Sequence, residues 1–179
     1  MLNDRVRSVA RSGYLLPSQL RNAAAGVRDR VRKGARQAAA ITHETTRMRL
    51  SVMAMAGGHE LPLHDHPGCW GMTLVLGGRA RVRRYHRVGL VGQGRVARLQ
   101  YLGESRQGPG GLLRYGRRHA NLHAVSAEDA DTVLLNLRVG RLGAMTSYFP
   151  FVDSSITGAI IHAAVLSCSR YRIVTGAMT

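Results

Sequence analysis

The chain is 179 residues long, and its 26 basic residues outnumber its 10 acidic ones to give a formal net charge of +16. This length suits one domain with an extension and can bury a sizeable core, whereas two cysteines are too few for a disulfide framework. No apolar run reaches the roughly 20 residues of a membrane-spanning helix, so we predict no transmembrane segment.

Nearly all of the positive charge is arginine, because Lys33 is the only lysine. Arginine binds phosphate and carboxylate groups through paired hydrogen bonds, so the excess favours an anionic partner, either RNA or an acidic protein surface. A GC-rich coding sequence would also favour arginine over lysine, but it does not account for the scarcity of acidic residues.

Residues 1–49 form a basic arm, with eleven basic and three acidic residues. Alanine-rich runs at 23–25 and 38–40 favour a mainly helical structure. We expect one stripe of this arm to contact nucleic acid or a protein partner, the alternative being a solvated surface helix. The arginines of the stripe recur at spacings of seven and four: Arg21, Arg28, Arg32 and Arg36. An arginine-rich, acid-poor N-terminus is also typical of a mitochondrial targeting sequence. We therefore predict a mitochondrial location, with the cytoplasm as the alternative.

Residues 50–179 are predicted to form a β domain, because the pattern changes to short strands at about residue 48. The predicted strands cover 48–55, 61–66, 71–76, 79–83, 96–102, 119–125, 132–139, 156–166 and 169–174, with a glycine-rich loop at 103–116. Many short strands with regular turns predict a sandwich or a small barrel.

The strand at 79–83 alternates arginine with small apolar residues, the pattern of a half-exposed strand. Its arginines are predicted to face outward and to extend the surface for RNA or another partner. The contact residues predicted there are Arg79, Arg81, Arg83 and Arg84.

The run Leu61-Pro-Leu-His-Asp-His-Pro-Gly68 places two histidines at alternate positions. Side chains at i and i+2 of a strand share one face, so His64 and His66 point together while Asp65 turns away. Neutral imidazole is a ligand for iron, zinc, copper and nickel, and this pair predicts half of a metal site. Histidines that merely fill a polar surface are the alternative. Cys69, three residues on, is more typical of a small buried thiol than of a ligand.

The segment from Gly58 to Gly77, with the histidine pair inside it, resembles the first motif of the cupin barrel. Cupins usually carry a glutamate after three or four residues that follow the pair, and at those positions this chain has Trp70 and Gly71. The resemblance implies an all-β, cupin-type double-stranded β-helix, or jelly-roll barrel, behind a basic and mainly helical N-terminal extension.

The histidine run and the strand at 71–77 more narrowly resemble the thiol dioxygenases of the cysteamine dioxygenase and plant cysteine oxidase branch. Asn121-Leu-His123 is similar to the element that carries this family's third metal ligand, and 168–172 resembles its Cys-x-Tyr-Tyr-Arg ending. The resemblance implies that His64, His66 and His123 hold Fe(II). The site could instead hold another divalent metal or none, and His119 is the competing third ligand. It also makes Tyr171 a candidate catalytic residue.

The implied reaction adds both atoms of dioxygen to the sulfur of a thiol substrate, cysteamine or an N-terminal cysteine, and yields a sulfinic acid. Three neutral ligands leave Fe(II) with its full charge, which favours a bound thiolate.

Several departures from the family pattern predict altered or lost activity. Asn136 stands where the family has an aspartate, and an amide cannot act as a base or as the counter-charge of a substrate amine. The segment 138–142 replaces the family's Pro-Pro-Tyr, and Arg170 stands where a cysteine–tyrosine cross-link needs tyrosine. Asn136 therefore remains a candidate catalytic position with changed chemistry.

Two other functions remain open at this point. A catalytically diverged cupin could be a structural subunit that contacts RNA or protein in a large mitochondrial assembly such as the ribosome, as the net charge and the basic arm suggest. A weaker alternative is a small-molecule-binding or isomerase cupin that uses another metal.

Overall fold

The computed structural model describes residues 17–116, 121–128, 130–142, 145–151 and 158–166. These residues form the helix α2 (Pro17–Arg32) and eleven strands. In chain order the strands are β1 (Gln37–Glu44), β2 (Met48–Met55), β3 (Glu60–Asp65), β4 (Cys69–Gly77), β5 (Ala80–Val91), β6 (Val96–Gln107), β7 (Leu112–Tyr115), β8 (Leu122–Ala127), β9 (Thr132–Gly140), β10 (Thr146–Pro150) and β11 (Ile160–Leu166).

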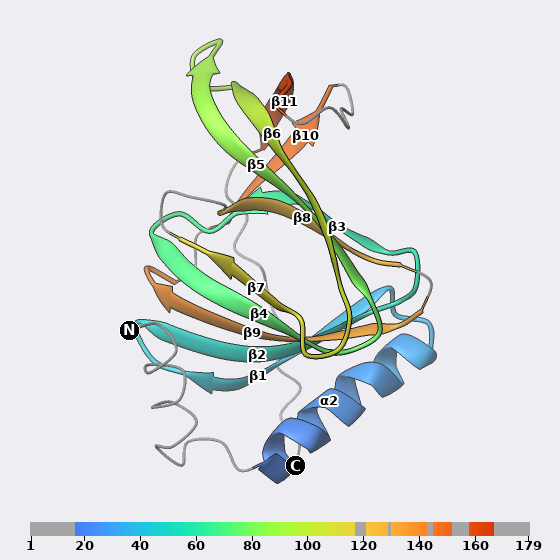
Figure 1. Cartoon of the computed structure of the whole chain (residues 1–179). Helices are drawn as coiled ribbons and strands as arrows, with labels where there is room; N and C mark the ends of the chain where they lie inside the picture. Colours follow the sequence, from blue (N-terminus) through green and yellow to red (C-terminus); the bar gives the residue numbers. More distant parts are fainter. Residues whose placement is uncertain (1–16, 117–120, 129, 143–144, 152–157, 167–179) are drawn as a thin grey trace.

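The strands build two layers that face each other (Figure 1). One layer is a five-stranded sheet in the order β1-β2-β9-β4-β7. The other contains β10-β11-β6-β5-β8-β3, which closes on itself because β3 pairs with β10. The prediction of an all-β barrel is therefore confirmed. Within the described residues, no helix combines the length and the apolar character needed to cross a membrane.

Alternating side chains fill the space between the layers. Met55, Val75 and Leu134 of the five-stranded sheet pack against Val82 and Val125 of the other layer. Because successive side chains in a strand point to opposite faces, the same alternation places other residues of β8 and β9 on these inner faces. This geometry brings polar residues of the two layers together at one site.

Helix α2 covers the outer face of the five-stranded sheet. Val27 and Val31 of the helix are buried against Val52, Ala54 and Val133. This packing removes apolar surface of both elements from water, the dominant favourable term in folding. The described part of the basic arm thus packs onto the sheet instead of extending away from it.

In the described part of the arm, residues 17–49, α2 is followed by β1 and the start of β2, so the helix expected at 38–40 is wrong. Those residues lie in β1, which pairs with β2, and Ala38 is buried beneath α2. Alanine favours a helix only weakly, and the pairing and burial override that preference. The helix ends before Gly34, which has a φ of +101°. The N–H of Gly34 binds the Val31 carbonyl and the N–H of Ala35 binds the Arg30 carbonyl, which is a Schellman motif.

The predicted stripe of four arginines is therefore interrupted. Arg21 and Arg32 are exposed on α2 and Arg28 is half-buried there, but Arg36 lies beyond the end of the helix. Residues 1–16 of the arm lie outside the described residues.

Most of the predicted strands are present, with errors at their ends. β2 has the predicted bounds, and β9 is one residue longer than predicted. The loop expected at 103–116 is wrong, because β6 continues to Gln107 and β7 follows at Leu112–Tyr115. The strand predicted at 169–174 lies outside the described residues.

Candidate metal centre

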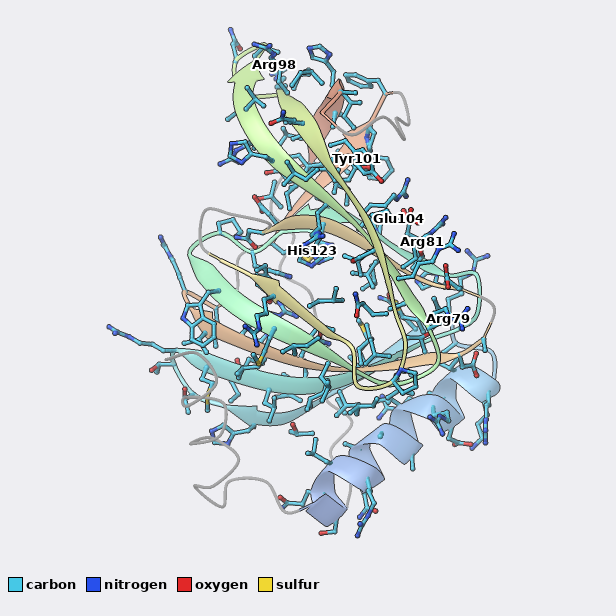
Figure 2. All side chains as sticks on the ribbon, in the orientation of Figure 1. Arg79, Arg81, Arg98, Tyr101, Glu104 and His123 are labelled. Atoms are coloured by element: carbon cyan, nitrogen blue, oxygen red, sulfur yellow. The ribbon has the colours of Figure 1, made fainter. Side chains whose placement is uncertain are left out.

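Three histidines meet on the inner face of the layer that contains β3 and β8. His64 lies on β3, His66 follows the end of that strand, and His123 lies on β8. His64 and His123 are direct partners in the β3–β8 pairing, which places them side by side. One ligand atom from each of the three rings lies within 4.8 Å of the others, and all three residues are buried. Figure 2 shows His123 projecting from β8 into the space between the layers.

Backbone carbonyl groups orient two of the rings. His64 Nδ1 lies 2.7 Å from the Pro62 carbonyl oxygen, and His123 Nδ1 lies 2.9 Å from that of Asn121. A carbonyl oxygen can only accept, so each Nδ1 carries the proton and donates it. The Nε2 lone pair of each ring is then available to a metal, the arrangement that second-shell carbonyls give to histidine ligands.

The three imidazoles are held in the neutral form that binds metals. Burial is the main cause that lowers the pKa of His64, of His66 and of His123 below the usual value. The positive charge of Arg138 lowers all three pKa values further. Neutral rings at physiological pH do not need to lose a proton before they bind a metal ion.

Among the described residues, the histidine cluster includes no carboxylate. Asp65 points away from the cluster, where its Oδ2 accepts a hydrogen bond of 2.9 Å from the Tyr148 hydroxyl. At Gly71, where cupins usually place a carboxylate, an added Cβ would lie 2.5 Å from the Tyr115 hydroxyl oxygen. Tyr115 thus fills the space that a longer side chain would need. Three imidazoles fit Fe(II), zinc or another divalent metal of intermediate softness.

Tyr115 is a site residue that the sequence did not reveal. Its ring centroid lies 5.5 Å from that of His66 and 5.2 Å from that of His123. Burial raises the pKa of its hydroxyl above the usual value, so the hydroxyl stays protonated near neutral pH. The glycine-rich context of 103–116 hid the strand β7 that carries this residue.

The five-stranded sheet contributes two more polar residues to the inner face. Asn136 and Arg138 are two residues apart on β9, and each pairs with a residue of β4. The Thr73 hydroxyl donates a hydrogen bond of 2.7 Å to the Asn136 side-chain oxygen. Arg138 Nη1 lies 3.4 Å from His66 Nδ1. Arg138 was not among the predicted site residues, although strand alternation places it on the same face as Asn136.

Cys69 is buried, as predicted, and is not part of the histidine cluster. Its thiol donates a hydrogen bond of 2.9 Å to the Arg141 carbonyl oxygen. The competing ligand His119 and the candidate Tyr171 lie outside the described residues.

The arginines around the start of β5 are largely engaged with acidic residues. The ion pairs there are Arg79–Glu128 at 3.9 Å, Arg81–Glu104 at 3.9 Å and Arg83–Glu60 at 2.6 Å. Arg84 is half-buried and lies in register with His123 on the inner face of its layer. The neighbouring glutamates offset the charge that this surface offers to an anionic partner.

The two-layered barrel and the histidine cluster between its layers define a cupin with a candidate metal site. The family model PCO_ADO, that of the plant cysteine oxidases and cysteamine dioxygenases, matches residues 16–137, which is more than half of the chain. The chain belongs to this family. The match includes α2 and β1, so the later part of the basic arm is shared with the family.

Solved structures with a similar fold include three of low sequence identity. The dimethylsulfoniopropionate (DMSP) lyase DddQ of Ruegeria pomeroyi is 23% identical over 60% of this chain and 48% of that chain, with a TM-score of 0.43. A cupin superfamily protein of Desulfitobacterium hafniense is 16% identical over 57% of this chain and 76% of that chain (TM-score 0.41). The cupin domain of Cnp3 from Schizosaccharomyces pombe is 13% identical over 59% and 66% respectively (TM-score 0.46). No curated protein matches the sequence.

Proposed function

We propose that this chain is an iron-dependent thiol dioxygenase. The observation that carries the proposal is the cluster of three buried, neutral histidines without a carboxylate ligand, in a chain of this family. His64, His66 and His123 would hold Fe(II). When bound, the metal would supply a cationic site for a thiolate and for dioxygen together with redox chemistry.

The proposed reaction converts a thiol and dioxygen into a sulfinic acid. The sulfur loses four electrons and gains two S–O bonds, and the O–O bond breaks as dioxygen accepts those electrons. No other reductant is consumed.

The protein's own residues position and shield this chemistry. The carbonyls of Pro62 and Asn121 fix the rings of His64 and His123, while burial between the layers excludes water from the cluster. The protonated hydroxyl of Tyr115 lies beside the ligands as a hydrogen-bond donor. The amide of Asn136 cannot accept and release a proton as an aspartate can. Asn136 is therefore proposed to line the site as a polar residue and not to act as a base.

Oxygen uptake by the Fe(II)-loaded protein tests the proposal. The panel should include cysteamine, a peptide with an N-terminal cysteine, free cysteine and 3-mercaptopropionate, with the product identified after reaction with isotopically labelled dioxygen. We expect a sulfinate that carries both labelled atoms, and no turnover by His123→Ala. Absence of sulfinate with every thiol of the panel would overturn the proposal.

The alternative role, a subunit that contacts RNA in a large assembly, is supported by the net charge and by exposed arginines of α2 such as Arg21 and Arg32. RNA binding would weaken steeply with salt because phosphate contacts release counterions. Co-sedimentation with ribosomes at moderate salt tests this role, and a monomer free in cell extract would contradict it. Mitochondrial location stays a prediction of the basic arm alone.

A further inference from the structure

Arg138 places a positive charge beside the histidine cluster. The residue lies on the inner face of β9, and Nη1 is 3.4 Å from Nδ1 of His66. Burial is the main cause that lowers its pKa, although the guanidinium remains charged. In the described part of the chain, no ion pair involves Arg138. The charge is therefore desolvated without a carboxylate partner there.

The carboxylate whose charge acts on the pKa of Arg138, Glu44, is already bound by another arginine. Arg49 is the register partner of Arg138 in the β2–β9 pairing. Its guanidinium binds Glu44 Oε1 with two hydrogen bonds, of 3.2 Å from Nε and 2.6 Å from Nη2. Glu44 thus neutralises Arg49, and the charge of Arg138 remains available.

Metal binding would remove the hydrogen-bond acceptor that Arg138 has in the structure. Arg138 can only donate, so His66 Nδ1 accepts in this contact and has no proton. A neutral His66 that binds a metal through its other nitrogen carries its proton on Nδ1, and two donors would then face each other. A buried cation without an acceptor is costly, and an anionic group that bound Arg138 would relieve that cost.

The surroundings in the described residues add positive charge, and the two carboxylates that act on the site are engaged elsewhere: Glu44 by Arg49 and Asp65 by the Tyr148 hydroxyl. Arg84 lies in register with His123 on the opposite inner face, and its Nε is buried without a hydrogen-bond partner in the described residues. Asn136, two residues before Arg138, provides a neutral amide. A site with this charge repels an ammonium group and attracts a carboxylate.

We infer that the site takes a small thiol bearing a carboxylate, which Arg138 binds while the sulfur occupies the metal. This inference rests on the proposed function and specifies its substrate class. An aminothiol such as cysteamine would instead bring its ammonium group towards the guanidinium of Arg138.

Three thiols with two methylene groups between the sulfur and the polar group separate these cases: 3-mercaptopropionate, 2-mercaptoethanol and cysteamine, whose polar groups are negative, neutral and positive. Their dissociation constants for the Fe(II)-loaded protein can be measured by calorimetry without oxygen. We expect 3-mercaptopropionate to bind about 10- to 100-fold more tightly than cysteamine, the range of a charge-assisted hydrogen bond. Arg138→Met should abolish this preference, whereas Arg98→Met should keep it, because Arg98 is exposed on β6 (Figure 2).

The outcomes distinguish the two proposals. Equal binding of the three thiols, tighter binding of cysteamine, or a preference that survives in Arg138→Met would overturn this inference and leave the proposed function standing. Failure of all three thiols to bind would also overturn this inference, whereas the proposed function is decided separately by oxygen uptake with the full panel, which includes the N-terminal-cysteine peptide. If Arg138→Met does not load metal, the comparison of the three thiols on the wild-type protein still decides.

Discussion

The side-chain amide of Asn121 binds the backbone of His66 at two points. Its Oδ1 accepts a hydrogen bond of 3.1 Å from the His66 N–H, and its Nδ2 donates one of 2.8 Å to the His66 carbonyl. The backbone carbonyl of Asn121 also accepts from the ring of His123. One buried residue of the Asn-Leu-His element thus holds two of the three candidate ligands in place.

Replacement of Asn121 by alanine should loosen the centre. We expect metal affinity to fall about 10- to 100-fold, the usual effect of losing an outer-shell partner. Stability should fall by about 1–3 kcal/mol, because the His66 N–H and carbonyl lose their buried partners. Metal titration and urea unfolding measure the two effects. Asn22→Ala, at an exposed position of α2, is the matched control. If Asn121→Ala kept the metal affinity of the wild type, the hydrogen bonds of Asn121 would not position the candidate ligands.

Divalent metal should stabilise the wild-type protein against heat. A ligand at about 100 times its dissociation constant adds about 2.7 kcal/mol, which corresponds to a rise of about 5–10 °C in Tm for a chain of this size. His123→Ala should lose the shift because two ligands remain, while His162→Ala should keep it because His162 is exposed on β11. A shift of equal size in both variants would place the bound metal elsewhere. Differential scanning fluorimetry with and without Fe(II) makes the measurement.

The sequence located the three candidate ligands because their signals are local or belong to a family pattern. The i, i+2 spacing of His64 and His66 predicts that both side chains lie on the same face of a strand. In the structure they do lie together, although β3 ends at Asp65. His123 came from the family resemblance, and the pairing of β3 with β8 places it beside His64. The turn signals at Gly57-Gly58 and at 128–131 bounded β2 and β9 in the sequence, and both strands are present there.

The remaining site residues depend on pairings that the sequence does not display. The strand β7 lies in a glycine-rich stretch, so Tyr115 looked like part of a loop until its pairing with β4 was known. Arg84 follows a run of outward arginines, yet its register with His123 turns it inward. Arg138 had one usable signal, its position two residues beyond Asn136 on a predicted strand.

Acid should destabilise the metal-free protein through the three histidines. Burial lowers their pKa values in the folded state, so below the unfolded pKa of about 6.5 the unfolded chain binds more protons. Stability is then present above that pH and is lost as the pH falls, by about 1 kcal/mol per histidine between pH 7.5 and 5.5. Urea unfolding at the two pH values tests this. A variant with glutamine at all three positions should lose most of the dependence, and an unchanged dependence would assign it to other groups.

Gly71 should not tolerate even a methyl group. A Cβ there would lie 2.5 Å from the Tyr115 hydroxyl oxygen and closer still to the Leu137 carbonyl oxygen, whose backbone is fixed by the β4–β9 pairing. We expect Gly71→Ala to lower the free energy of unfolding by about 1–3 kcal/mol, the typical cost of overpacking. Gly89→Ala on β5, where no atom lies within 4 Å of the added Cβ, is the control.

A second change separates the two close contacts of Gly71. Tyr115→Phe removes the hydroxyl, so the Gly71→Ala/Tyr115→Phe double variant should recover only part of the loss, because the contact with the Leu137 backbone remains. Chemical denaturation of the four proteins of this cycle gives the coupling energy between the two residues. Full recovery would mean that the Tyr115 hydroxyl alone excludes a side chain at Gly71, and no recovery would place the whole cost on the backbone of β9.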